Sequence, residues 1–244
     1  MDTTTLAIAA TFALAGFVKG VIGLGLPTVA IGLLSVVMPP AHAAALLIVP
    51  STVTNVWQLA AGPALGALLR RLWPMLLGVC FGTWVGSGLL TTGSERAVVA
   101  LGVALVLYAA LGLVNVRAAV PSRAQPWLGP LIGGATGVVT AATGVFVIPA
   151  VPYLQALGLD TDDLVQALGL SFTISTLALA ASLAGEGAFD LSVAGASLVA
   201  LVPACVGMVA GTWVRARVKP EPFRLCFFAG LLLLGAHLAL RGVI

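Results

Sequence analysis

The sequence predicts an all-α polytopic membrane protein made of two homologous halves, and three observations carry this prediction. Apolar residues make up 60% of the chain and charged residues only 8%, whereas soluble domains carry roughly 25% charged residues. Apolar segments follow one another with no extramembrane domain between them. The pattern G-x-x-x-G-T-W-V occurs twice, at Gly78–Val85 and Gly207–Val214, an offset of 129 positions (207 − 78) in 244 residues.

Hydropathy divides the chain into eight apolar segments. They cover residues 4–38, 41–61, 72–92, 97–116, 127–158, 163–184, 192–214 and 223–243. Further matches between the halves, such as Ser51 with Ser171 and Gly102 with Gly230, extend the repeat beyond the octapeptide. We therefore expect two transmembrane repeats, 1–120 and 127–244, that form one integrated membrane domain.

Two of the segments are too long for one membrane crossing. A helix over residues 4–38 would be roughly 50 Å long, against a hydrocarbon core of about 30 Å. Residues 127–158 pose the same problem, and each segment is interrupted, at Gly20–Pro27 and at Thr140–Gly144. Glycine weakens a helix and proline removes a backbone donor, so we expect a break in each. Either the segment crosses once, or it returns to its starting side as a re-entrant hairpin.

The basic residues favour the hairpins. With single crossings, five basic residues fall on each side of the membrane, and no orientation results. With hairpins, only Arg96 and Arg241 lie on one side, and eight basic residues share the other. The eight are Arg70, Arg71, Arg117, Arg123, Arg215, Arg217, Lys219 and Arg224. Such an imbalance is the positive-inside pattern. Each half then crosses an odd number of times, which makes the two halves inverted repeats, each with three transmembrane helices after its first segment.

Lys19 is the candidate centre of a binding site, because it is the only basic residue well inside an apolar segment. A charge in that position is costly and usually functional. It directly precedes the break formed by Gly20, Gly23 and Gly25. Broken helices expose N-termini whose free N–H groups and dipole favour anions. We therefore expect an oxyanion site here, the alternative being that Lys19 extends to a membrane interface.

Polar side chains form a stripe on the next segment. Ser51, Thr54, Asn55 and Gln58 stand at i, i+3, i+4 and i+7, which is one face of a helix. We call them the polar stripe. Facing lipid, the stripe would be unfavourable, so we expect it to face protein or a water-filled path. Its hydroxyl and amide donors suit an oxyanion, and interhelical hydrogen bonding is the alternative.

The second half repeats this arrangement with smaller residues. Ser171 and Ser175 occupy the positions that match two members of the polar stripe, and Thr140, Thr143 and Gly144 surround the second break. Threonine stands where the first half has its lysine, at Thr136. We therefore expect these residues to contribute to one asymmetric site between the halves.

The composition argues against other chemistry. All eight acidic residues lie in predicted loops, at segment ends or at the N-terminus, and the two histidines and three cysteines form no cluster. An active site would need an acid–base set, metal ligands or an activated nucleophile within reach of one another. We therefore expect no enzyme, no metal or other cofactor, and no nucleic-acid partner.

Two glycine clusters and the duplicated layout resemble the sulfite exporter TauE/SafE family of bacterial permeases. The clusters are G-x-x-G-x-G at Gly20, Gly23 and Gly25, and its echo at Gly137, Gly144 and Pro149. The resemblance covers nearly the whole chain, although Leu26-Pro27 in the first half, and threonine and alanine in the second, replace glycines of the family pattern. It implies transport of small sulfur-containing anions, such as sulfite, thiosulfate or organosulfonates, across the bacterial inner membrane.

The sequence thus favours a secondary transporter, because two inverted copies with broken helices are the architecture of alternating access. Two alternatives remain open, an anion channel and a non-transporting membrane scaffold. A channel would give unitary currents and a carrier saturable flux, whereas a scaffold would give no flux in vesicles. The expected partners are a small sulfur anion and the lipid bilayer, with a homodimer left open.

Overall fold

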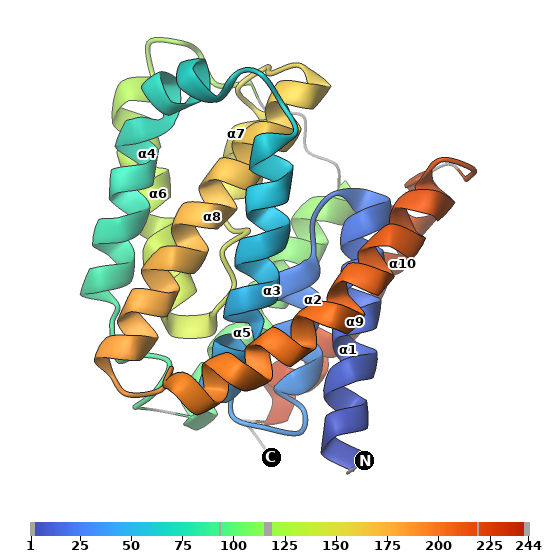
Figure 1. The fold of residues 1–244 in the computed structure, drawn as a ribbon. Helices are drawn as coiled ribbons and strands as arrows, with labels where there is room; N and C mark the ends of the chain where they lie inside the picture. Colours follow the sequence, from blue (N-terminus) through green and yellow to red (C-terminus); the bar gives the residue numbers. More distant parts are fainter. Residues whose placement is uncertain (1–2, 93, 115–118, 219, 242–244) are drawn as a thin grey trace.

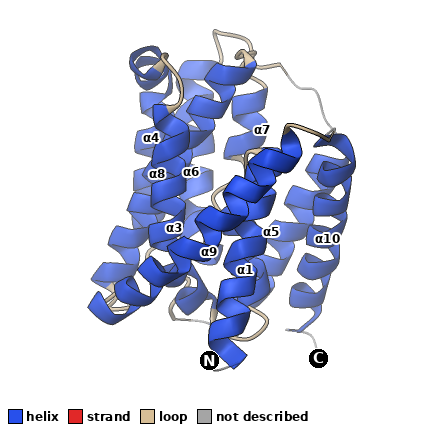
Figure 2. Ribbon diagram, turned by 45° about the vertical axis from the view of Figure 1, so that its right-hand side comes forward, coloured by secondary structure: helices blue, strands red, loops and turns tan. Residues whose placement is uncertain are grey.

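Helices account for most of the chain in the computed structural model, which describes residues 3–92, 94–114, 119–218 and 220–241. Arg117 and Lys219 of the charge count lie outside the described residues. In chain order the helices are α1 (Thr3–Ile22), α2 (Leu26–Leu34), α3 (Pro40–Ala60), α4 (Leu65–Val85), α5 (Ser94–Val114), α6 (Gln125–Thr143), α7 (Ala150–Gln155), α8 (Thr161–Gly185), α9 (Leu191–Arg215) and α10 (Pro220–Arg241). The described residues contain no strand (Figure 2).

The predicted all-α membrane fold is confirmed. Seven helices in the described part of the chain are long and apolar enough to cross a membrane, namely α1, α3, α4, α5, α8, α9 and α10. Helix α6 spans 19 residues, but its glycine, threonine and proline residues lower its hydropathy and leave it outside this group.

Both long segments fold back toward the end of the bundle at which they start (Figure 1). Helix α1 ends at Ile22, Gly23 and Gly25 take positive φ angles of 85° and 106°, and α2 then runs back beside α1. In the second half, α6 continues through Thr143 and ends at Gly144, whose φ is 72°. The predicted interruption at Thr140–Gly144 is therefore displaced to 144–149, because only its glycine leaves the helical conformation.

In each of the four most extensive helix–helix contacts, a helix of the first half packs against a helix of the second half. Helix α1 packs on α9, α4 on α6, α3 on α8 and α5 on α10. Both copies of the octapeptide make close approaches, since a Cβ on Gly82 would lie 2.1 Å from the Gly134 carbonyl oxygen, and one on Gly211 would lie 2.1 Å from that of Phe17. Two backbones can approach this closely only where small residues face each other.

Helices at matching places in the two halves run in opposite directions. In the α3–α8 pair, Ser51 lies beside Thr176, and Gln58, further along α3, contacts Val165, which is earlier in α8. In the α5–α10 pair, a Cβ on Gly102 would meet Ala239, and one on Gly112 would meet Phe228.

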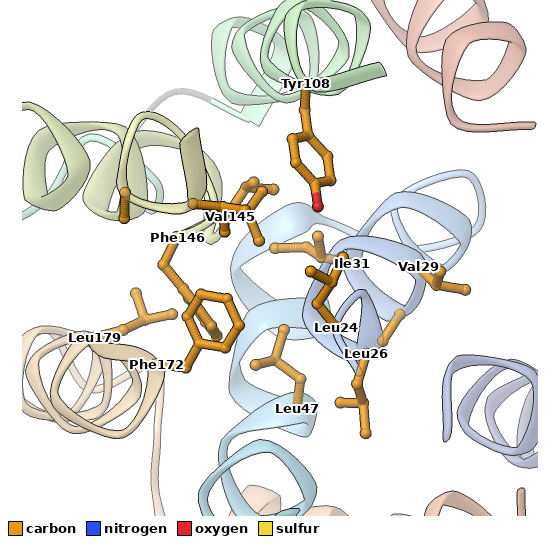
Figure 3. Close-up of a cluster of buried hydrophobic side chains, with 14 of the residues drawn as sticks. Leu24, Leu26, Val29, Ile31, Leu47, Tyr108, Val145, Phe146, Phe172 and Leu179 are labelled. Carbon is orange, nitrogen blue, oxygen red and sulfur yellow. The ribbon is translucent and has the colours of Figure 1, made fainter. Parts of the chain in front are cut away.

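An apolar core lies between the two broken segments (Figure 3). Phe146, in the second break, packs against Phe172 of α8 with ring centroids 5.3 Å apart. Ile31 of α2 approaches the same break closely enough that a Cβ on Gly144 would lie 2.2 Å from its Cδ1 atom. The breaks are therefore held by packed side chains, and their backbone conformation is set by the core.

Proline inside α3 creates a defect that α9 repairs. Pro50 has no N–H group, so the Leu46 carbonyl lacks its usual helical donor. The buried Ser197 hydroxyl donates to that carbonyl at 2.7 Å and accepts from the Val49 N–H at 3.0 Å. A buried carbonyl or N–H without a partner is costly, and more so in a membrane, so Ser197 stabilises α3 at the point where the polar stripe begins.

Replacing Ser197 with alanine is expected to destabilise the protein by about 2 kcal/mol or more, because two buried backbone groups lose a partner. Adding Pro50→Ala should recover much of this loss, since alanine restores the missing N–H. Thermal unfolding of the two single variants and the double variant in detergent measures both effects. Equal melting temperatures for wild type and Ser197→Ala would contradict the assigned role.

Glu186 joins two connections at one end of the bundle. It follows α8, and its carboxylate accepts from the Ser87 hydroxyl at 2.7 Å, the Gly88 N–H at 2.6 Å, the Ser182 hydroxyl at 3.1 Å and the Thr91 hydroxyl. Burial raises the pKa of Glu186, but these hydrogen bonds together outweigh it and lower the pKa below its ordinary value. The carboxylate therefore holds the α4–α5 connection against the end of α8.

Acidification is expected to weaken this junction. Because the folded-state pKa of Glu186 is lowered, its stabilisation is present above the ordinary value of 4.5 and is lost as the pH falls through the lowered pKa. Glu186→Gln should cost roughly 1 kcal/mol at neutral pH, since the site is partly exposed. Melting temperatures measured against pH should fall more steeply in acid for wild type than for Glu186→Gln, and parallel curves would contradict this.

Candidate functional site

Lys19 lies in the last turn of α1, where the helix meets its glycine break. The Lys19 carbonyl accepts the final helical hydrogen bond, from the Gly23 N–H at 2.8 Å. The C-terminal end of a helix carries partial negative charge, which favours a cation there. The glycines then turn the chain into α2, whose first helical hydrogen bond runs from the Val29 N–H to the Gly25 carbonyl at 2.9 Å. Lys19 and the N-terminus of α2 thus belong to the same break.

The Lys19 side chain points to the polar stripe of α3. Its Nζ donates to the Thr54 Oγ1 atom at 3.1 Å and to the Asn55 Oδ1 atom. The side chain is only 5% exposed, and both partners are uncharged. The prediction that the stripe faces protein is confirmed, since Ser51, Thr54, Asn55 and Gln58 are all buried.

A chain of hydrogen bonds leads from Lys19 across α3 to α8. Asn55 accepts from the lysine, and its Nδ2 donates to Ser51 Oγ at 3.1 Å and to Thr176 Oγ1 at 3.4 Å. The Thr176 hydroxyl in turn donates to the Phe172 carbonyl at 2.7 Å. Because Asn55 uses its oxygen for the cation and its amino group for the hydroxyls, the orientation of its amide is determined by its neighbours.

Gln58 of α3 bonds both to the glycine break and to α8. Its Nε2 donates to the Gly23 carbonyl at 3.2 Å and to the Val165 carbonyl of α8 at 3.1 Å. Its Oε1 atom is buried and has no hydrogen-bond partner. The two carbonyls require the amino group on their side, so an unused acceptor remains on the other side of this amide.

Ser171 and Ser175 are completely buried in α8, and neither hydroxyl has a hydrogen-bond partner. They stand four residues apart, one turn of the helix, at the positions that match Ser51 and Asn55. Buried polar groups in native proteins are nearly always paired with protein, water or ligand. These two hydroxyls are therefore free to bind a group that the protein itself does not supply.

The threonines of the second break use their hydroxyl hydrogens within α6. Thr140 donates to the Thr136 carbonyl at 2.7 Å, and Thr143 donates to the Val139 carbonyl at 2.7 Å. Thr143 also accepts from the Val145 N–H at 3.1 Å, beside Gly144. Both side chains thus stabilise the end of α6, and they differ from the expected donors in that only their oxygen lone pairs remain for another molecule.

Gly20 lies outside the group around Lys19. A Cβ on Gly20 would be 2.3 Å from the Met208 carbonyl oxygen of α9, so this glycine permits the α1–α9 contact. Gly20 thus has a packing role in the structure, and its contribution to the binding site stays a prediction. Gly23 and Gly25 remain beside Lys19 and Gln58.

Two residues near the site had no strong signal in the sequence. Gln166 caps the end of α3, accepting from the Ala64 N–H at 2.9 Å and donating to the Leu59 carbonyl at 2.8 Å. Ser197 repairs the defect left by Pro50. Only the proline inside a predicted helix could have indicated that a donor was needed from elsewhere.

These features define a multi-pass membrane protein with a buried polar site that contains one lysine beside a helix break. A family model described as Sulfite exporter TauE/SafE matches residues 8–238 of this chain. The protein therefore belongs to this family of membrane transporters, which confirms the resemblance drawn from its glycine clusters and duplication. Family membership indicates a membrane transporter. No curated protein and no solved structure matched the chain.

Proposed function

We propose that the protein is a secondary transporter that carries small sulfur-containing oxyanions, with sulfite as the reference substrate, across the bacterial inner membrane. The observation that carries this proposal is the buried Lys19, whose hydrogen-bond partners Thr54 and Asn55 are both neutral. Every acidic residue that the structure describes lies at a helix end or in a connection. A buried cation without an acidic partner is unfavourable by itself and is stabilised when an anion binds.

The groups that we assign to the binding site suit the recognition of an oxyanion. The first turn of α2 offers backbone N–H groups, and helix N-termini attract negative charge. Ser171 and Ser175 supply hydroxyls without partners. The Gly23 and Gly25 break allows the two helix ends to meet beside Lys19. We assign substrate contact to these residues and to the polar stripe, with Thr140, Thr143 and Gly144 shaping the opposite side.

We further propose that the two halves form an inverted repeat with both termini on the outer side of the membrane. The antiparallel α3–α8 and α5–α10 pairs support this arrangement. The start of α4, the start of α6 and the end of α9 gather at one end of the bundle, away from both termini (Figure 1). Arg70 lies in the first turns of α4, Arg123 just before α6, and Arg215 at the end of α9. Reporters fused after Arg71 and after Glu186 should report opposite sides of the membrane, and a common side would refute the topology.

Flux through the purified protein tests the function. Proteoliposomes should be challenged with sulfite, thiosulfate, sulfonates, sulfate and small carboxylates, and uptake of sulfur oxyanions should saturate and show exchange. Unitary currents in planar bilayers would instead indicate a channel. Absence of flux for every anion would leave the scaffold as the better description.

A further inference from the structure

Lys19 is the only charged side chain among the buried residues that the structure describes. All other polar groups in the site are hydroxyls and amides, which carry no net charge. The described arginines are exposed, and those nearest in sequence to the site residues, Arg70 and Arg71, bond to the Gly66 carbonyl and to Gln125. The site therefore contributes at most one positive charge, from Lys19.

This charge matches some anions better than others. A singly charged oxyanion placed beside Lys19 forms a neutral pair, and neutral hydrogen-bond donors can satisfy its remaining oxygens. A doubly charged oxyanion leaves one negative charge uncompensated in a site of low dielectric constant, where an unpaired charge is expensive. Two anions of equal size should therefore bind with very different affinities.

The unused acceptor on Gln58 also favours one kind of anion, namely an oxyanion that carries a proton. Its Oε1 atom is buried without a partner, while its amino group is engaged by the Gly23 and Val165 carbonyls. A fully deprotonated oxyanion, such as sulfate or a sulfonate, offers only acceptors and leaves this oxygen unsatisfied whatever its charge. A protonated oxyanion such as hydrogensulfite brings an O–H donor that the oxygen can accept.

We propose that this site selects singly charged oxyanions over doubly charged ones, so that hydrogensulfite is the transported form of sulfite. The inference rests on the proposed transport function and narrows it. It places monovalent sulfonates among the accepted substrates, and it removes thiosulfate and sulfate, which are divalent.

Methanesulfonate and sulfate provide a matched pair, because both are tetrahedral sulfur oxyanions and differ mainly in one charge. In proteoliposomes that contain the wild-type protein, sulfate should inhibit hydrogensulfite uptake at least about tenfold more weakly than methanesulfonate. Lowering the pH should raise sulfite uptake as the dianion takes up a proton. Methanesulfonate uptake under the same conditions shows any effect of pH on the protein itself.

A charge-addition variant tests the physical cause. Gln58→Lys places a second positive charge one helical turn from Asn55 and should reduce the difference between sulfate and methanesulfonate. An unchanged difference in folded Gln58→Lys protein would contradict the charge argument. If this variant does not fold, the wild-type comparison decides alone.

The outcomes separate the two proposals. Equal inhibition by sulfate and methanesulfonate in wild-type vesicles would overturn the charge selectivity and leave sulfur-anion transport intact. If no sulfur oxyanion is transported, and none raises the melting temperature of the purified protein, both proposals fail.

Discussion

Replacing Lys19 with glutamine is expected to reduce anion transport by about a hundredfold or more. A cation and an anion 4 Å apart attract each other by about 4 kcal/mol at an effective dielectric constant of 20, and each 1.4 kcal/mol corresponds to a tenfold change. Glutamine can still donate to Thr54 and Asn55, but it supplies no charge. The variant should remain folded, because it removes the only buried charge among the described residues and with it a desolvation cost. Initial uptake rates normalised to protein in the membrane measure the effect.

Two further variants test whether the loss of transport is caused by the missing charge at Lys19. Lys19→Arg keeps the charge and should retain more transport than Lys19→Gln, although its larger planar group fits the site differently. Arg70→Gln removes an exposed charge whose Nε bonds only to the Gly66 carbonyl, and it should transport like wild type. Normal transport by Lys19→Gln, at a normal protein level, would refute the assignment of Lys19 as the anion-binding group.

Much of the fold could be predicted from the sequence, because membrane crossings leave a strong signal. Predicted segments such as 41–61 and 163–184 correspond closely to α3 (Pro40–Ala60) and α8 (Thr161–Gly185). The third segment was placed too late, since 72–92 was expected and α4 is Leu65–Val85. Arg70 and Arg71 lowered the hydropathy of its first two turns without interrupting the helix.

The first-half part of the candidate site could also be predicted, because one helix contains most of it. Periodicity alone places Ser51, Thr54, Asn55 and Gln58 on one buried face. Periodicity does not show which helix this face packs against. The bonds to Lys19 and to α8 depend on how three helices pack together. The role of Ser197 was hidden for the same reason, since it serves a proline 147 positions away (197 − 50).

The position of the second break is harder to predict, because threonine and glycine both occur there and either could end the helix. The break is predicted over Thr140–Gly144, which contains both threonine and glycine, and both have a lower helix propensity than alanine. In the structure, Thr140 and Thr143 each bond to the carbonyl four residues earlier and remain helical. The positive φ of Gly144 is what ends the helix, so glycine conformation decided the position and threonine propensity did not.

Replacing Gly133 with alanine is expected to destabilise the protein by about 3 kcal/mol, the upper end of the usual cost of overpacking. Its Cβ would lie 2.0 Å from the Met75 carbonyl oxygen of α4, and backbone cannot move aside as a side chain can. Gly211→Ala should behave alike, since its Cβ would lie 2.1 Å from the Phe17 carbonyl oxygen. These substitutions push apart the α4–α6 and α1–α9 pairs, which join the two halves. Loss of monodisperse protein on size exclusion and a lower melting temperature would report the damage.

The neighbouring glycine of α6 supplies the control. A Cβ on Gly134 would meet nothing within 4 Å, and alanine is a better helix former than glycine by roughly 0.5–1 kcal/mol. Gly134→Ala should therefore match or exceed wild type, although it differs from Gly133→Ala by one position. Gly195→Ala serves the same purpose in α9, where a Cβ also meets nothing within 4 Å. Equal stability of Gly133→Ala and Gly134→Ala would show that α4 and α6 do not approach each other at Gly133 as closely as this geometry requires.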